Sequence, residues 1–322
     1  MTVLVAAHML TKNFSIGGNQ VVHALDEVTL SIAEREIVGL VGESGSGKST
    51  FGKALVGLHD KTSGTVTYRG ERLPQKYTPQ DFQQHAQRMQ MIFQDPYSSL
   101  NPRMTVGEII GEGPKLHSRA STADVREQVA EWLRRVGLEP DHMSRYPHEF
   151  SGGQRQRIGI ARALIMQPEF VVCDEPISAL DVSVQAQVVN LLDDLKASMG
   201  LTLLFIAHDL SMVRYVSDRM AVMYLGSLVE TGPADRVFYD PRHPYTQLLI
   251  GSNPEPDPAA ERTRKSSEII GEIPSPVNIP PGCRFANRCP KVMDVCRVTR
   301  PPLIPLKNVD GPERLVACHL FG

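Results

Sequence analysis

The sequence lacks any long apolar run, any strong excess of charge and any targeting segment. In its 322 residues no stretch approaches the roughly 18 apolar residues with which a helix crosses a bilayer, so nothing in it spans a membrane by itself. The first residues have no basic region and too short an apolar run for a signal peptide. A net charge of −2 gives no electrostatic argument for nucleic acid or an anionic membrane surface as a partner. The remaining composition, 41% hydrophobic and 22% charged, is typical of a soluble globular protein.

Cysteine is scarce and unevenly placed. Of five cysteines, Cys173 lies in an apolar, strand-like run, and four fall near the end of the sequence, namely Cys283, Cys289, Cys296 and Cys318. Because nothing marks the chain as secreted, we expect thiolates or metal ligation before disulfides. The spacing C-x5-C-x6-C-x21-C is neither the C-x2-C of most structural zinc sites nor a ferredoxin run. Four such thiolates could ligate a [4Fe–4S] cluster or zinc, or could remain unligated.

The most informative stretch is a glycine-rich loop between an apolar strand-like segment and a helical pattern. It fits G-x-x-x-x-G-K-[ST], the phosphate-binding P-loop, with Gly42, Ser44, Gly45, Ser46, Gly47, Lys48, Ser49 and Thr50. Glycines let successive backbone N–H groups face an anion, and the following helix adds its positive end. Lys48 would reach the β- and γ-phosphates, and the Ser49 hydroxyl would coordinate Mg²⁺.

Three further apolar, strand-like segments end in polar side chains. Gln94 follows the first, Asp174 and Glu175 follow the second, and His208 follows the third. In open α/β sheets ligands bind beyond these strand ends. We therefore expect Gln94 near Mg²⁺ or the attacking water, and Asp174 either in direct contact with Mg²⁺ or bonded to one of its ligands. Glu175 would polarise the water, and His208 would contact the γ-phosphate. A purely structural role is the alternative for Gln94 and His208.

Three weaker features accompany these strand ends. Residues 151–154 (Ser151, Gly152, Gly153 and Gln154) precede a helical pattern and predict a second anion site, which we expect to serve a nucleotide held by another subunit. Asp181 ends a tight turn ahead of the helix expected over 182–197. Phe14 lies in a strand-rich segment, where its ring could stack on adenine or pack locally.

The order of these patterns predicts an α/β fold. Residues 1–93 and 160–232 would form a nucleotide-binding core, a mostly parallel sheet with helices on both faces and an antiparallel β unit at its start. Residues 94–159 would form an inserted helical subdomain. Proline and polar residues multiply in 233–322, which predicts a linker or extended arm and an irregular extension that carries the four cysteines.

These motifs in this order resemble the ATP-binding cassette (ABC) ATPases. The resemblance implies a head-to-tail dimer with two ATP molecules, each held by the P-loop of one subunit and the signature of the other. By this resemblance, residues 42–50 with Lys48 are the Walker A motif, residues 151–154 are the signature and residues 178–181 are the D-loop. Gln94 is the Q-loop glutamine, Asp174 the Walker B aspartate and Glu175 the general base. His208 is the switch histidine and Phe14 the A-loop aromatic.

Segments outside the core, 93–102, 242–246, 271–276 and 280–290, resemble the oligopeptide/dipeptide permease branch, and most of all its second ATPase subunit. The resemblance implies MgATP hydrolysis that drives uptake of oligopeptides or dipeptides. The implied partners are a second ABC ATPase in a heterodimer, two membrane permease subunits and an extracytoplasmic peptide-binding protein, without nucleic acid. The chain would lie peripherally on the cytoplasmic face of the inner or plasma membrane, held there by the permease subunits. Among the metal alternatives, the resemblance favours a structural [4Fe–4S] cluster.

Other functions are compatible with parts of this pattern. Nickel chelates or glutathione could be the cargo, since related subunits carry such solutes. A soluble ABC ATPase that acts on nucleic acid or ribosomes usually has two cassettes or a basic arm, whereas this chain has one cassette and a net charge of −2. A non-hydrolysing regulatory subunit is disfavoured because Glu175 and His208 are present.

Overall fold

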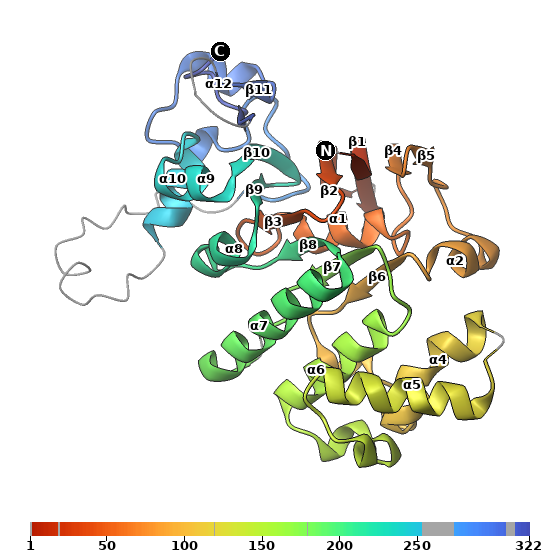
Figure 1. The fold of residues 1–322 in the computed structure, drawn as a ribbon. Helices are drawn as coiled ribbons and strands as arrows, with labels where there is room; N and C mark the ends of the chain where they lie inside the picture. The colour runs from red at the N-terminus through yellow and green to blue at the C-terminus, as the bar shows by residue number, and fades with distance from the viewer. Residues whose placement is uncertain (1, 19, 119, 179, 253–273, 307–312) are drawn as a thin grey trace, which may run out of the picture.

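The computed structural model describes residues 2–18, 20–118, 120–178, 180–252, 274–306 and 313–322 (Figure 1). The chain begins with an antiparallel sheet of order β2-β1-β4-β5. Its strands are β1 (Val3–Ser15), β2 (Val21–Ala33), β4 (Ser63–Tyr68) and β5 (Glu71–Arg72). The predicted antiparallel unit ahead of the P-loop is therefore confirmed.

The second sheet carries the P-loop and has the order β11-β12-β10-β9-β3-β8-β7-β6. Its strands are β3 (Ile37–Val41), β6 (Met89–Ile92), β7 (Phe170–Asp174), β8 (Thr202–Ile206), β9 (Arg219–Tyr224), β10 (Ser227–Pro233), β11 (Ile304–Pro305) and β12 (Leu315–Val316). The pairs from β9 through β3, β8 and β7 to β6 are parallel. Every residue of β3, β7 and β8 is buried, as expected of strands covered on both faces. The predicted α/β class is confirmed.

Alternating residues of the parallel strands feed two separate cores. Val38 and Leu40 belong to the core shared with α1 (Lys48–Leu55) and the antiparallel sheet, whereas Ile37 and Val41 belong to the other core. This division follows from the two-residue period of a strand. Four helices contribute buried residues to the core that contains Ile37 and Val41, namely α7 (Val182–Met199), α8 (Leu210–Val216), α9 (Ala234–Tyr239) and α10 (Pro244–Gly251). Cys173 lies fully buried in a core, as its apolar surroundings predict.

A helical segment lies between β6 and β7 and packs at one end of the large sheet (Figure 1). After α2 (Pro79–His85), which precedes β6, the elements are α3 (Pro96–Ser99), α4 (Val106–His117), α5 (Thr122–Arg135), η1 (Pro140–Ser144), η2 (Pro147–Glu149) and α6 (Gly152–Leu164). Ser121 caps α5 in a reciprocal pair with Asp124. Within the described residues, no helix is both long and apolar enough to cross a membrane.

The C-terminal residues differ from the predicted linker or arm. Helices α9 and α10 pack in the core that contains Ile37 and Val41, and β12 extends the large sheet by pairing with β10. Tyr245 and Phe285 are buried beside Tyr224, with ring centroids 4.6 and 5.3 Å from it. Single aromatic residues among prolines produce no periodic pattern, so this aromatic packing could not be predicted from the sequence. Residues 253–258 and 271–273 of the predicted segments lie outside the described residues.

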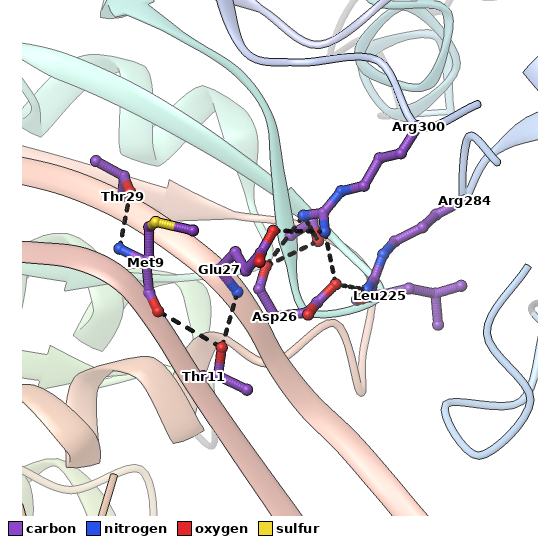
Figure 2. A network of polar contacts seen from close by, with 9 residues as sticks. Met9, Thr11, Asp26, Glu27, Thr29, Leu225, Arg284 and Arg300 are labelled. Atoms are coloured by element: carbon purple, nitrogen blue, oxygen red, sulfur yellow. Dashed lines mark hydrogen bonds and ion pairs between the residues drawn. The ribbon is translucent and has the colours of Figure 1, made fainter. Parts of the chain in front are cut away.

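Short elements and arginines attach the end of the chain to the antiparallel sheet. The elements are η3 (Ala286–Arg288) and α12 (Asp294–Val298). Figure 2 shows Arg284 and Arg300 reaching the same carboxylate, that of Asp26 on β2. Arg300 lies 2.7 Å from Asp26 and 3.3 Å from Glu27, and Arg284 also donates to the Leu225 carbonyl. The C-terminal region is therefore anchored to both sheets.

Candidate functional site

The loop after β3 has the shape that a phosphate site requires. Gly42, Gly45 and Gly47 adopt φ values of 153°, 76° and 103°. A Cβ on Gly42 would lie 2.2 Å from the Met223 carbonyl oxygen, and one on Gly47 would lie 2.4 Å from that of Ala24. Among the described residues no side chain caps α1, and its first turn contains no acidic residue. The N–H groups at this helix start are therefore available to an anion.

Lys48 lies at the mouth of this loop. Its Nζ donates to the carbonyl oxygens of Gly42 at 2.8 Å and Glu43 at 2.9 Å, and the residue is only 5% exposed. Burial lowers the pKa of Lys48, although the carboxylates of Glu175 and Asp174 act in the opposite direction. A phosphate oxygen bound at the loop could replace the Glu43 carbonyl as a partner of this ammonium while the bond to Gly42 remains.

Ser49 and Asp174 join the start of α1 to the end of β7. The Ser49 hydroxyl donates to Asp174 Oδ1 at 2.7 Å, and Asp174 is 2% exposed. Burial raises the pKa of Asp174, and the bond from Ser49 opposes this effect. A hydroxyl and one carboxylate fit Mg²⁺, which usually keeps several waters and takes phosphate oxygens as further ligands.

The desolvated carboxylate predicts a pH-dependent effect on stability. Because the folded-state pKa of Asp174 is raised, its ionisation destabilises the folded protein as pH rises through the interval between the unfolded and folded pKa values. In nucleotide-free protein, Asp174→Asn should therefore melt at a higher temperature than wild type near neutral pH. The difference should shrink as pH falls through the folded-state pKa of Asp174, because the wild-type carboxyl then becomes protonated and neutral like the amide. Thermal melts of wild type, Asp174→Asn and the exposed control Asp193→Asn test this, and equal melting temperatures at every pH would contradict it.

Glu175 is contacted by residues that follow the two neighbouring strands. Gln94 Nε2 donates to Glu175 Oε2 at 2.8 Å, and His208 Nδ1 lies 3.6 Å from the same oxygen. These residues follow β6, β7 and β8, which are neighbours in the sheet. Glu175 adopts φ 44°, a left-handed conformation rare outside glycine, and its N–H donates to the Ile206 carbonyl at 2.9 Å. Strained backbone of this kind clusters at functional sites.

The second predicted anion site lies on α6, which Figure 1 shows apart from α1. Ser151 is exposed and caps the helix in a reciprocal pair with Gln154, the two bonds measuring 3.3 and 3.0 Å. A Cβ on Gly153 would lie 2.5 Å from Val184 of α7, and one on Gly152 would lie 3.5 Å from Leu180. Glycine therefore permits close packing between the start of α6 and the segment around α7. The exposed Asp181 precedes α7 and makes no capping bond with its described backbone.

Phe14, on β1, has two partners close by. Its ring meets His59 edge-on at 5.4 Å between centroids, and Lys12 Nζ lies 4.8 Å from the ring centroid. The side chain remains half-exposed. Both alternatives expected of Phe14 are thus compatible with its position, and stacking on adenine stays a prediction.

The metal prediction for Cys283, Cys289, Cys296 and Cys318 is wrong. No three His, Cys, Asp or Glu side chains among the described residues form a group that could hold a metal ion, so neither a [4Fe–4S] cluster nor zinc is supported. All four are free thiols. Burial raises the pKa of Cys283 to about 11 and also raises that of Cys289 and Cys318. Desolvation thus favours the neutral thiol, whereas metal ligation needs the thiolate.

Sequence reasoning missed the contacts that Tyr245 and Arg288 make with Glu43 of the P-loop. The Glu43 N–H donates to Tyr245 Oη at 2.8 Å, and both carboxylate oxygens of Glu43 accept from Arg288, at 2.7 and 2.9 Å. Tyr245 and Arg288 lie in two of the segments that carry the family resemblance. No spacing rule links those segments to the P-loop, so only the folded structure reveals the contact.

The site combines a P-loop, placed between a parallel strand and a helix, with Glu175 and its partners Gln94 and His208 at the ends of adjacent strands. This arrangement defines a P-loop nucleoside triphosphatase. The chain matches the ABC transporter family over residues 25–178 and the oligopeptide/dipeptide transporter C-terminal region over residues 229–296. The chain therefore belongs to the ABC transporter ATPases, in the branch with the oligopeptide/dipeptide transporter C-terminal region. The predicted resemblance is confirmed.

Two curated relatives are similar over most of their length. The putative oligopeptide transport ATP-binding protein YkfD of Bacillus subtilis is 54% identical over 99% of this chain and 95% of the relative. The oligopeptide transport ATP-binding protein OppF of Salmonella typhimurium is 53% identical over 87% of this chain and 84% of the relative. Among solved structures, the ATP-binding cassette MJ0796, a dimer in a post-hydrolysis state bound to ADP and Pi, has a TM-score of 0.66 at 28% identity, covering 72% of this chain and 99% of its own.

Proposed function

We propose that this chain is the ATP-hydrolysing subunit of an ABC importer that takes up oligopeptides or dipeptides. The observation that carries the enzymatic part is the convergence of Gln94 and His208 on one carboxylate oxygen of Glu175, whose charge also acts on Lys48 at the start of α1. The names of YkfD and OppF support the peptide cargo. Selection of nickel chelates or glutathione is the alternative for the cargo.

Each residue of the site takes one task in hydrolysis. The loop N–H groups and Lys48 bind the β- and γ-phosphates, and Ser49 and Asp174 hold Mg²⁺, which when bound neutralises phosphate charge. Glu175 accepts the proton of the attacking water. Gln94 and His208 orient Glu175 from opposite sides of the site, and His208, with 64% of its side chain exposed, is free to reach the γ-phosphate.

The second anion site serves a nucleotide on another subunit. Ser151 is exposed, and α6, which it caps, lies apart from α1 (Figure 1), so this helix start can approach the P-loop of a second ABC ATPase in a head-to-tail dimer. Residues 94–159 act as the helical subdomain, residues 1–93 and 160–232 as the core, and residues 233–322 as the C-terminal extension.

A groove beside Gln94 suits the membrane partner. It has a volume of about 250 Å³ and is lined by Phe93, the residue before Gln94, and by the exposed Leu58, Phe82 and Leu116. Apolar residues exposed together mark an interaction surface. We assign this groove to a cytoplasmic segment of the permease subunits. The chain then lies peripherally on the cytoplasmic face of the membrane, and the peptide-binding protein lies on the opposite side.

Uptake and hydrolysis measured together test this function. In cells that lack the chain, wild type should restore uptake of labelled oligopeptides, and Ser151→Ala should not. Ser151→Ala should also reduce ATP hydrolysis of the assembled importer by about tenfold or more, while MgADP binding to the P-loop of the separate chain stays unchanged.

Ser121→Ala is the matched control, because Ser121 makes the same kind of helix cap at a distance from the site. Both variants lose a cap worth about 1 kcal/mol, so their stabilities should fall alike. Equal hydrolysis by the two variants would contradict the role of Ser151. Restored uptake of another solute without peptide uptake would contradict the cargo and leave the ATPase assignment intact.

A further inference from the structure

The peptide group between Gly42 and Glu43 is held from both sides. Its carbonyl oxygen, on Gly42, accepts from Lys48 Nζ at 2.8 Å. Its N–H, on Glu43, donates to Tyr245 Oη at 2.8 Å. A peptide group is planar and trans, so its C=O and N–H point in opposite directions. The bond to Tyr245 therefore fixes the direction in which the Gly42 carbonyl faces Lys48.

The side chain of Glu43 is held by the same region of the chain. Both of its carboxylate oxygens accept from the Arg288 guanidinium, whose side chain is 2% exposed. Such a paired fork is geometrically specific. Arg288 also lies near the Tyr224 hydroxyl, at 3.4 Å, and its guanidinium carbon is 5.8 Å from the Phe285 ring centroid. Tyr245 and Arg288 come from α10 and η3, so two separate elements of the C-terminal region meet at one P-loop residue.

The residues that hold Glu43 are themselves rigidly packed. Tyr245 is fully buried, and its ring centroid lies 4.6 Å from that of Tyr224 and 5.4 Å from that of Phe285. Tyr224 ends β9, the strand that pairs with β3 directly before the P-loop. The hydroxyl of Tyr245 is therefore fixed relative to the sheet, and through the Gly42–Glu43 peptide it fixes the loop.

We propose that Tyr245 and Arg288 are positioning residues of the nucleotide site, through which the C-terminal region holds the P-loop and Lys48 in the conformation that binds phosphate. This inference rests on the proposed function, because it concerns the same nucleotide site. Neither residue touches the reacting atoms. Both act through Glu43. Without them the loop would become ordered only when nucleotide binds, and the free-energy cost of that ordering would lower the affinity.

Tyr245→Phe in the full-length chain is the most selective test, since it removes one hydroxyl and keeps the ring. We expect the Kd for MgADP, measured by calorimetry, to rise roughly five- to tenfold, and the KM for ATP to rise in parallel. The kcat should stay within about twofold of wild type, because Glu175, Gln94 and His208 are unchanged. A purely structural role would lower the melting temperature without this separation of KM from kcat.

Tyr239→Phe is the matched control, since it removes a hydroxyl that accepts from Arg214 at 2.7 Å, on an exposed residue of α9. Its MgADP affinity should equal that of wild type. The double variant Glu43→Gln/Arg288→Met removes the ion pair without leaving a buried charge unpaired, and it should also bind MgADP more weakly. Wild-type affinity in both Tyr245→Phe and the double variant would overturn the inference. Failure of the wild-type chain to bind MgADP would instead overturn the proposed function.

Discussion

Replacing Glu175 with glutamine should reduce steady-state ATP hydrolysis by about 10²–10⁴-fold. The amide cannot accept a proton from the attacking water, yet its oxygen can still accept from Gln94 Nε2, which lies 2.8 Å from the present carboxylate. Folding and nucleotide binding should therefore be retained. Phosphate release from the assembled importer, measured with saturating MgATP, gives the rate.

The same variant should accumulate in the ATP-bound state that precedes hydrolysis. Size-exclusion chromatography with MgATP should show an ATP-dependent dimer that wild type forms only transiently. Glu34→Gln provides the control, because Glu34 is a surface partner of Arg69 outside the site. Wild-type turnover in Glu175→Gln would exclude Glu175 as the general base, and loss of turnover in Glu34→Gln would point to a nonspecific effect.

Arg314→Met should destabilise the protein by about 3–5 kcal/mol, because it leaves a buried carboxylate without its cation. The side chains of Arg314 and Glu230 are 1% and 0% exposed, and their nearest atoms lie 2.6 Å apart. Glu230 also accepts from the backbone N–H groups of Arg242 and His243, at 3.0 and 2.9 Å. Urea unfolding followed by circular dichroism measures the loss.

Two further variants isolate the cause of this loss. The double variant Glu230→Gln/Arg314→Met should recover most of the stability, since glutamine keeps an acceptor for the two N–H groups without a charge. Arg69→Met, which removes an exposed arginine paired with Glu34 and Glu169, should change the unfolding midpoint little. No difference between Arg314→Met and Arg69→Met would contradict the buried pair as a stabilising contact.

The parts of the site built by short local patterns were predictable from sequence. The glycines around Lys48 indicate a backbone conformation that other residues rarely adopt. An apolar strand followed by a polar residue indicates that the polar side chain lies at the end of the strand. Gln94, Glu175 and His208 therefore meet because three parallel strands end at one edge. Neither their distances nor the left-handed conformation of Glu175 follows from spacing.

The C-terminal region was beyond such patterns. Its packing depends on single large residues, such as Tyr245 and Phe285, whose partners lie far away in sequence. In the sequence, Arg288 is a charged residue between two cysteines, and no pattern links it to the P-loop. Only the folded structure shows its ion pair with Glu43. The cysteine prediction failed for a related reason. The spacing shows that four thiols are present but not how they are surrounded. The desolvation that raises the pKa of Cys283 exists only in the folded chain.

The position of β12 has a consequence for how the chain is made. β10 lies between β9, which directly precedes it in sequence, and β12, which begins only at Leu315. A chain emerging from the ribosome therefore presents β10 with one edge unpaired, the edge on which Glu230 and Thr231 later pair with Val316 and Leu315. An open strand edge pairs readily with other chains. We therefore expect the nascent protein to be prone to aggregation in the interval between synthesis of β10 and synthesis of β12.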